Sequence, residues 1–532
     1  MPDLRLRSPR LYDLIAIFAC VAALALALLI GLTKHKMGTF GTETDFYGPY
    51  IAQVENILAG KPYTYQHLPP GYCLLLAGVS RVTGDLFLAA KLISAVSVAL
   101  LGWLAYCLHK AVFDARLALV GMGLALIALI PYSFLATTDV LTALVIILPL
   151  WVLLRKAPID RKTCFLTGLA TGLAYLVRYN SVFIVAGIAI ALCFINPDRQ
   201  PWKERIAMLG MFMAGTLLLA GPWLILNWQI NGDPFASTIY VQMGKYFYGL
   251  DPTASYSYTE IPDEAQMGTA LQTLAAEFNS LAAVILHNPA KFLPRYLDSI
   301  FISHIHQLAL NSWKFPAYLF VGSGILFLLI QCDRRQAALL VPYLFGHLFL
   351  GLFSFQHRYY FFLYPFLFLL VGYALFQPKI VRSLGKIPVI QLPTSWVFVA
   401  VLALFLNFSA LGEVRSLLAS EPRHLLEAVT FLQERAADDA IIVSGKPHLA
   451  RFANLRRVFP AAKTAEDYLE VAQSIGAQYL VYSDLESSVW PSLKVLKNPD
   501  ALPEEFELIY QHEPTNTLIY EIPLNPKKSS PN

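Results

Sequence analysis

The sequence predicts an α-helical protein that crosses a membrane many times and carries a small α/β domain near its C-terminal end. Of its 532 residues, 56% are hydrophobic and only 14% are charged, which is the composition of a chain that lies mostly in lipid. Apolar segments of spanning length recur between residues 14 and 411, separated by short basic loops. The net charge of +4 is small and dispersed, so no nucleic-acid partner is expected.

The first apolar run, residues 14–32, follows three arginines and is long enough to span a bilayer. We expect it to be an uncleaved helix with a cytoplasmic N-terminus. Ten further apolar runs predict a total of about eleven transmembrane helices: 86–108, 117–134, 140–154, 165–176, 182–194, 206–230, 316–330, 337–353, 359–376 and 396–411. Basic residues fall on alternate loops, as the positive-inside rule requires, and an odd number of spans places the C-terminal region outside.

The predicted organisation has three parts. Residues 1–411 form the membrane domain, with long outer loops at 33–84 and 231–314. The second of these loops contains an amphipathic stretch, 267–284, that we expect to lie on the membrane surface. Residues 412–525 form the small extracytoplasmic domain, and residues 526–532 are an expected disordered tail.

The C-terminal region has the pattern of an α/β domain. Strand-length apolar runs occur at 440–444, 478–483, 507–511 and 517–522, and helical patterns at 424–435 and 465–475 alternate with them. This alternation predicts a partly parallel sheet. The segment SGKPHLAR at 444–451 lacks the glycine spacing of a phosphate-binding loop, so we interpret it as a strand-to-helix turn.

The cysteines give no sign of a disulfide framework or a metal site. The six cysteines fall in or beside apolar segments, with no short C-x-x-C pair. Neither a disulfide framework nor a zinc site is therefore indicated.

The loop after the first span carries acids and aromatic residues next to the membrane, with Asp45 at its centre. A carboxylate beside the membrane is costly to place, and one that lies in the interior of a helical bundle is usually functional. The alternative is an ordinary interfacial loop with an aromatic belt. Its other candidate residues are Glu43, Tyr47, Tyr63 and His67.

Three further charges are predicted to reach the same leaflet: Asp139, Arg178 and Arg358. Each alone is explained as an interfacial anchor. Together they suit an anionic, lipid-borne substrate, because a guanidinium donates two parallel hydrogen bonds to phosphate. A carboxylate can also accept the proton of a hydroxyl nucleophile. The candidates are thus the acids Asp45, Asp139 and Glu43, the phosphate-binding residues Arg178, Arg358, His357 and His67, and the cavity tyrosines Tyr47, Tyr63 and Tyr359.

Four segments carry a family resemblance: TETDFYGPYIAQVENILAGKPY, HLPPGYCLLLAG, GLAYLVRYNSVFIVAG and HRYYFFLYPFLFLLVGYAL. Over residues 14–411 the chain resembles the GT-C class of integral-membrane glycosyltransferases, and it is most similar to bacterial relatives of protein O-mannosyltransferases and of the lipid A aminoarabinose transferase. The resemblance implies an enzyme of the bacterial plasma membrane.

The implied reaction transfers a sugar from a polyprenyl-phosphate carrier to an acceptor on the outer face, with inversion at the anomeric carbon. Asp45 would orient or deprotonate the acceptor, Asp139 would support it, and Arg178 and Arg358 would lie near the carrier phosphate. The acceptor class stays open among lipid, glycan and protein. The sugar stays open too, because the chain lacks both the Lys before Pro69 that aminoarabinose transferases often carry and the Asp-Glu pair of protein mannosyltransferases.

Two other classes of protein account for part of the same pattern. A transporter or lipid flippase would use the intramembrane charges as a substrate path, but no convincing repeat of two halves is visible. A structural scaffold would leave the charges without a role. Asp45, Asp139 and Glu43 are hard oxygen ligands that leave a divalent cation open, although no spacing requires one and no cofactor is otherwise indicated.

Overall fold

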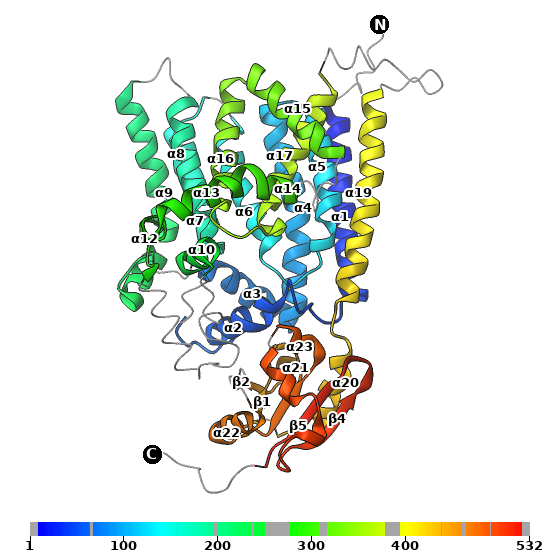
Figure 1. Ribbon diagram of the computed structural model, residues 1–532. Coiled ribbons are helices and arrows are strands. Elements are labelled where there is room, and N and C mark those ends of the chain that lie inside the picture. Colours follow the sequence, from blue (N-terminus) through cyan, green and yellow to red (C-terminus); the bar gives the residue numbers. More distant parts are fainter. Residues whose placement is uncertain are drawn as a thin grey trace. The chain divides into compact units, whose positions relative to one another are not determined.

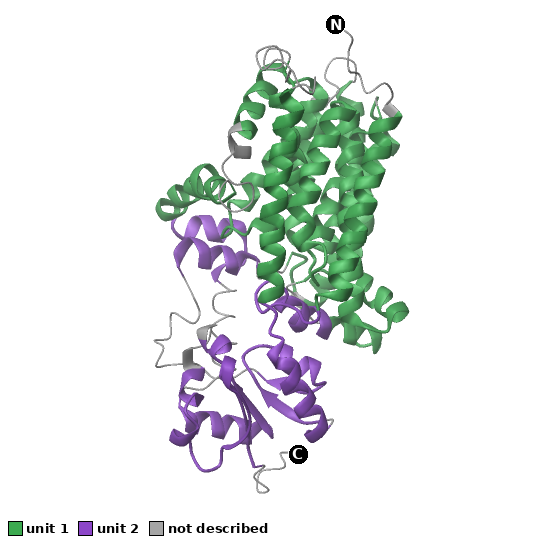
Figure 2. Cartoon of the chain, turned by 90° about the vertical axis from the view of Figure 1, so that its right-hand side faces the viewer, with its two compact units in different colours: residues 1–35, 53–237, 289–419 green, residues 36–52, 238–288, 420–532 purple. Residues whose placement is uncertain are grey.

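The structure, a computed structural model, consists of a bundle of long helices and an α/β domain (Figure 1). It describes residues 9–63, 68–156, 158–195, 201–235, 239–249, 277–308, 316–377, 394–437, 439–458, 464–489 and 491–523. The chain forms two compact units, coloured in Figure 2. Unit 1 comprises 1–35, 53–237 and 289–419, and unit 2 comprises 36–52, 238–288 and 420–532.

A helix is present in each of the eleven segments expected to span. These helices are α1 (Pro9–Thr33), α4 (Leu86–Val112), α5 (Ala115–Leu129), α6 (Asp139–Leu154), α7 (Arg161–Val177), α8 (Phe183–Ile195), α9 (Trp202–Asn231), α15 (Pro316–Gln331), α16 (Arg334–Leu350), α17 (Tyr364–Leu375) and α19 (Thr394–Ala419). Six of them, taken with the turns that continue them, are long and apolar enough to cross a membrane. The chain is therefore a multi-pass membrane protein, and the count of eleven spans stays a prediction.

Aspartates start several of these helices. The side chain of Asp85 accepts a hydrogen bond from the Leu88 backbone N–H at the start of α4. Asp114, Asp160 and Asp333 cap α5, α7 and α16 in the same way. Such a cap satisfies a backbone N–H that has no partner within the helix, which fixes where each helix begins.

Glycines allow α7 and α9 to approach closely. A Cβ atom added at Gly168 or Gly172 of α7 would meet the backbone of α9, and one added at Gly215 of α9 would meet the backbone of α7. Small residues of this kind let membrane helices pack at short range, where dispersion between the helices stabilises the pair.

Ion pairs and hydrogen bonds join the basic ends of the helices. Arg161 at the start of α7 pairs with Glu204 at the start of α9, with Nη2 and Oε2 2.5 Å apart. Arg335 at the start of α16 donates to the Leu154 carbonyl at the end of α6. The last turn of α6 therefore lies at the basic end of the bundle, and its first turn, with Asp139, lies at the opposite end.

Shorter elements connect the long helices. The loop predicted at 33–84 contains the π-helix η1 (Phe46–Tyr50), α2 (Ile51–Leu58) and α3 (Pro70–Thr83). The other connecting elements are η2 (Ile130–Tyr132), η3 (Tyr179–Val182), α10 (Ile239–Tyr248), α12 (Leu281–His287), α13 (Pro289–Asp298), η4 (Ser299–Ser303), α14 (His304–Gln307) and η6 (His357–Leu363). Most of the amphipathic stretch expected at 267–284 lies outside the described residues.

The C-terminal part of unit 2 is built on a five-stranded mixed sheet, in the order β2-β1-β3-β5-β4. Its elements are α20 (His424–Arg435), β1 (Ile441–Val443), α21 (His448–Phe452), β2 (Arg456–Val458), α22 (Ala465–Ile475), β3 (Tyr479–Tyr482), α23 (Asp484–Val489), η7 (Pro491–Leu496), η8 (Pro499–Ala501), β4 (Glu507–His512), η9 (Glu513–Thr515) and β5 (Thr517–Glu521). β1 pairs in parallel with β2 and β3, whereas β5 pairs antiparallel with β3 and β4. The expected strands and helices are present, and β2 is an additional strand.

Alternating side chains of the sheet enter two apolar cores. Ile442 and Val481 pack with α20 and α21 on one face, while Val443 and Leu480 pack with α22 and η7 on the other. This alternation is the period-two pattern of a strand with helices on both faces.

The division into units differs from the one expected at residue 412. Helix α19 continues to Ala419, and the segment 36–52 belongs to unit 2. Met37 and Phe40 of this segment are buried with the core residues of α20 and α21. Their apolar side chains explain why this part of the loop packs on the α/β domain. The expected tail at 526–532 lies outside the described residues.

Candidate active site

Asp139 opens α6 at the end of the bundle opposite its basic end. The turn before it is fixed to α4 by Ser94, whose hydroxyl donates to the Leu135 carbonyl at 2.6 Å and to the Thr137 carbonyl at 3.3 Å. The Asp139 side chain is only 3% exposed. A carboxylate this deeply buried needs charged partners.

Arg178 and Arg358 are those partners. Arg178 ends α7 in extended backbone, and its Nη1 lies 2.5 Å from Asp139 Oδ1 and 3.0 Å from Thr138 Oγ1. Arg358, from η6, places its Nη1 3.7 Å from Asp139 Oδ2. Its Nε donates to Gln356 Oε1 at 2.8 Å. Three residues predicted to share one leaflet are thus in direct contact.

Tyr359 lies against both guanidinium groups. The Arg178 guanidinium carbon is 4.8 Å from the centre of the Tyr359 ring, and that of Arg358 is 5.6 Å from it. Such cation–π contacts hold a guanidinium plane in place without neutralising its charge. All these groups line one small pocket together with Asn180.

The charged residues that line this pocket are two arginines and one aspartate. Two guanidinium groups share one carboxylate, and the arginine side chains remain 19% and 18% exposed beside the pocket. A phosphate group could add two charge-assisted hydrogen bonds from either arginine while Asp139 keeps both arginines in place. The arrangement is therefore chemically suited to an anion.

His357 lies beside this cluster. Its ring centre is 5.1 Å from that of Tyr132 in η2, and its Nε2 is buried with no hydrogen-bond partner among the described residues. Tyr132 in turn donates to Glu413 of α19 at 3.3 Å. Sequence reasoning missed Tyr132 and Glu413, although an acid in the last turns of an apolar helix was a usable signal.

Tyr63 belongs to an aromatic group at the end of α7. Its hydroxyl donates to the Leu68 carbonyl at 2.9 Å, and its ring meets that of Trp223 edge-on at 5.4 Å. The Trp223 indole N–H donates to the Tyr179 hydroxyl at 3.0 Å, and Tyr179 directly follows Arg178. Tyr63 is therefore linked through this group to the chain segment that carries Arg178. His67 lies outside the described residues.

The remaining candidates, Glu43, Asp45 and Tyr47, belong to unit 2. Asp45 is exposed and directly precedes η1, without a side-chain capping hydrogen bond. Glu43 is fully buried, and its carboxylate accepts a hydrogen bond from the Thr39 backbone N–H at 2.8 Å. Tyr47 is buried, and its hydroxyl accepts from the Gly38 backbone N–H at 2.9 Å. Of the three side chains, only that of Asp45 faces solvent.

No group of three or more His, Cys, Asp or Glu side chains with metal-binding geometry occurs among the described residues.

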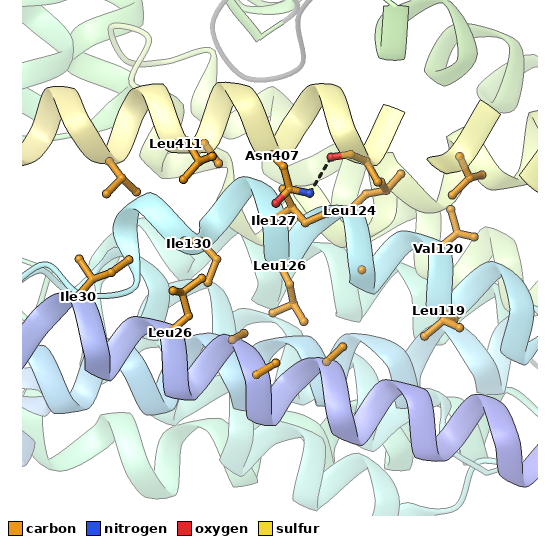
Figure 3. A pocket seen from close by; sticks show the side chains of 18 of the residues that line it. Leu26, Ile30, Leu119, Val120, Leu124, Leu126, Ile127, Ile130, Asn407 and Leu411 are labelled. Atoms are coloured by element: carbon orange, nitrogen blue, oxygen red, sulfur yellow. Dashed lines mark hydrogen bonds between the residues drawn. The ribbon is translucent and has the colours of Figure 1, made fainter. Parts of the chain in front are cut away.

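A larger cavity of about 480 Å³ lies between α1, α5 and α19. Figure 3 shows aliphatic side chains such as Leu26, Ile127 and Leu411 around it. Asn407 also lines the cavity, and its side-chain amide nitrogen donates to the Ala403 carbonyl of the same helix at 2.8 Å. The lining is thus suited to a hydrocarbon chain rather than to a sugar.

Several solved structures share this fold. The chain is similar to the oligosaccharyltransferase of Archaeoglobus fulgidus tethered with an acceptor peptide, with a TM-score of 0.58 and 15% identity over 95% of this chain and 75% of that chain. A complex of AglB from the same organism with an inhibitory peptide and a dolichol-phosphate matches with a TM-score of 0.54 and 14% identity, over 97% of this chain and 75% of that chain. ArnT of Cupriavidus metallidurans bound to undecaprenyl phosphate matches with a TM-score of 0.55 and 13% identity, over 96% of this chain and 97% of that chain.

These structures confirm the resemblance read from the sequence: the chain has the fold of the GT-C glycosyltransferases. Residues 67–226 match the family described as dolichyl-phosphate-mannose-protein mannosyltransferase. No curated protein matches the chain by sequence. The matched segment includes Asp139 and Arg178.

Proposed function

We propose that the protein transfers a sugar from a polyprenyl-phosphate carrier to an acceptor on the extracytoplasmic face of a bacterial plasma membrane, with inversion. The observation that carries this proposal is the pair of arginines on one buried carboxylate, Arg178 and Arg358 on Asp139, beside a pocket. Solved structures of the same fold hold dolichol-phosphate and undecaprenyl phosphate, whose headgroup is the anion that such a cluster fits.

In the proposed reaction, the Asp45 carboxylate takes the proton of the acceptor hydroxyl. The acceptor oxygen forms a bond to the anomeric carbon while the bond from that carbon to the phosphate oxygen breaks. The phosphate leaves with the electron pair, and Arg178 and Arg358 stabilise its developing charge. Attack opposite the leaving group inverts the configuration.

The other candidates receive supporting roles. Asp139 orients both arginines, and His357 offers a ring nitrogen near them. Glu43 and Tyr47 hold the turn around Asp45, because both are buried and accept backbone hydrogen bonds. Tyr63 and Tyr359 remain candidates for lining the substrate cavity, and His67 remains a candidate for binding the donor phosphate.

The acceptor is a lipid, a glycan or a protein, and the sugar is a hexose or a pentose. The decisive experiment offers purified protein a panel of polyprenyl-phosphate sugars and measures release of polyprenyl phosphate. Release that depends on an acceptor supports the proposal. Movement of the intact lipid across a bilayer without any release would instead identify a flippase.

Arg178→Ala and Arg358→Ala are each expected to weaken use of the donor by about 1.5 to 3 kcal/mol, because each removes a charge-assisted contact to the phosphate. The measurement is donor kcat/KM, together with thermal unfolding in detergent. Arg178→Lys and Arg358→Lys are the matched controls: they keep the charge but lose the two-pronged geometry, so partial recovery is expected. Full donor turnover by both alanine variants would reduce these residues to membrane anchors.

The proposed orientation predicts the result of reporter fusions. A reporter joined after Ala419, the last residue of α19, should be active outside the cytoplasm, and one joined after Lys156 should be active inside. The reason is the placement of basic residues on alternate loops. A cytoplasmic location for the reporter after Ala419 would contradict both the odd number of spans and the shared compartment of Asp45 and the α/β domain.

A further inference from the structure

The segment that carries Asp45 is built into the α/β domain of unit 2. Met37 and Phe40 fill the same core as the side chains of α20 and α21. Asp45 itself stays exposed, and the residues on both sides of it make the contacts. Within the described part of the chain, the position of this carboxylate is therefore set by its neighbours in the sequence.

Lys446 holds the N-terminal side of the turn. Its ammonium donates to the Phe40 carbonyl at 2.8 Å and to Thr44 Oγ1 at 3.1 Å, and Thr44 directly precedes Asp45. The Lys446 residue is only 9% exposed. Burial lowers the pKa of Lys446, and the charges of Glu486 and Asp45 oppose that effect. Both of these hydrogen bonds of the buried cation are made to the Asp45 segment.

The C-terminal side of the turn is held by the same stretch of the domain. The Tyr47 ring packs on His448 at 4.4 Å and on Phe452 at 5.5 Å, measured between ring centres. Its hydroxyl accepts from the Gly38 N–H, and a Cβ atom at Gly38 would collide with the Tyr47 ring. Asp45 thus lies between two anchored residues.

The loop that carries Lys446 is itself fixed. Arg457 donates from Nε to the Ser444 carbonyl at 3.0 Å and from Nη2 to the Gly445 carbonyl at 2.7 Å. Buried Glu486 accepts from the Gly445 N–H at 2.8 Å. Burial raises the pKa of Glu486 to about 7, and hydrogen bonds from the Gly445 and Lys446 backbone oppose this rise. Because these hydrogen bonds hold the backbone beside Lys446 in place, its side chain can in turn hold another segment in place.

We propose that Lys446 is a positioning residue for catalysis: through Phe40 and Thr44 it holds the turn that presents the Asp45 carboxylate. The strand-to-helix turn at 444–448 is then part of the catalytic apparatus. This inference rests on the proposed role of Asp45 as the base.

The test compares Lys446→Met with Lys497→Met. The first removes the ammonium and keeps the length of the side chain, while Lys497 is a half-exposed cation of the same domain that pairs with Asp484 at 3.2 Å. Lys446→Met is expected to lower kcat roughly 10- to 100-fold, as expected for a misplaced catalytic group. Donor KM should stay unchanged, and amide hydrogen exchange should accelerate within 37–47. Lys497→Met should behave like the parent protein.

Thr44→Val keeps the inference testable if Lys446→Met fails to fold. It keeps the side-chain shape but removes one acceptor of the Lys446 ammonium and the hydrogen bond from the Thr44 hydroxyl to the Phe40 carbonyl. A smaller loss of kcat at unchanged donor KM is therefore expected. When Lys446→Met and Thr44→Val are combined, the two losses of kcat should not add, because both substitutions remove the contact between Lys446 and Thr44. Unchanged kcat together with unchanged exchange at 37–47 in either variant would overturn the inference.

Asp45→Asn, measured alongside, separates the two claims. If it is inactive while Lys446→Met is fully active, the positioning role is wrong and the proposed function stands. If Asp45→Asn transfers normally, the assignment of the base is wrong, and the positioning of catalysis by Lys446 fails with it.

Discussion

Asp45→Asn is expected to lower the rate of sugar transfer by about 100- to 10,000-fold, because the amide cannot take up the proton of the acceptor hydroxyl. Expression, membrane insertion and donor binding should persist. Asp45 is exposed and makes no capping hydrogen bond at η1, so its replacement by a residue of nearly equal shape removes little that stabilises the fold. Single-turnover transfer and separate donor-binding measurements would distinguish lost chemistry from lost binding.

Glu43→Gln is the matched control for this variant, since Glu43 is the nearest acid in the chain. Its carboxylate is buried against the Thr39 N–H, and the glutamine carbonyl oxygen can accept the same hydrogen bond. We therefore expect near-normal transfer and at most a modest loss of stability. An active Asp45→Asn with an inactive Glu43→Gln would move the chemistry to Glu43. Two active variants would remove this loop from the mechanism.

The membrane helices could be predicted because long apolar runs leave the backbone few alternatives in lipid. Helices occupy all eleven predicted segments, and alternation placed Asp139, Arg178 and Arg358 at one end of the bundle. The alternation of loops between the two sides of the membrane predicts at which end of a helix a residue lies, but not in which direction its side chain points. The sharing of one carboxylate by two arginines therefore required the structure.

Two features were missed for identifiable reasons. Glu413 was placed after the last span, because one acid near the end of an apolar run looks like a boundary, whereas α19 continues to Ala419. The packing of residues 36–52 on the α/β domain was missed because Met37 and Phe40 lie in a loop without helical or strand periodicity. Isolated apolar residues in loops carry no signal of the partner that they contact.

Asp139→Asn is expected to have the largest effect on stability of any substitution considered for this protein. The Asp139 side chain is 3% exposed and pairs with Arg178 at 2.5 Å and Arg358 at 3.7 Å. Removing one partner of a buried ion pair typically costs about 3 to 5 kcal/mol, because the remaining charge is left without compensation. Here two guanidinium groups would also repel each other, so the arginines should lose the orientation that donor binding needs.

A less buried pair of the same length, whose Asp13 also accepts from the Tyr106 hydroxyl, is the matched control. Lys110 Nζ and Asp13 Oδ1 are also 2.5 Å apart, but their side chains are 35% and 33% exposed. Asp13→Asn should therefore cost at most about 1 kcal/mol. Thermal unfolding in detergent and donor binding would be measured for both variants.

A double variant distinguishes uncompensated charge from lost packing. Asp139→Asn combined with Arg178→Met removes both partners of the shorter contact, so it should recover part of the stability that Asp139→Asn alone loses. Donor binding should not recover, because one phosphate contact is then absent. An Asp139→Asn protein as stable as the parent, with normal donor affinity, would show that the two arginines hold their positions without the carboxylate, and Asp139 would then have no role in organising the phosphate site.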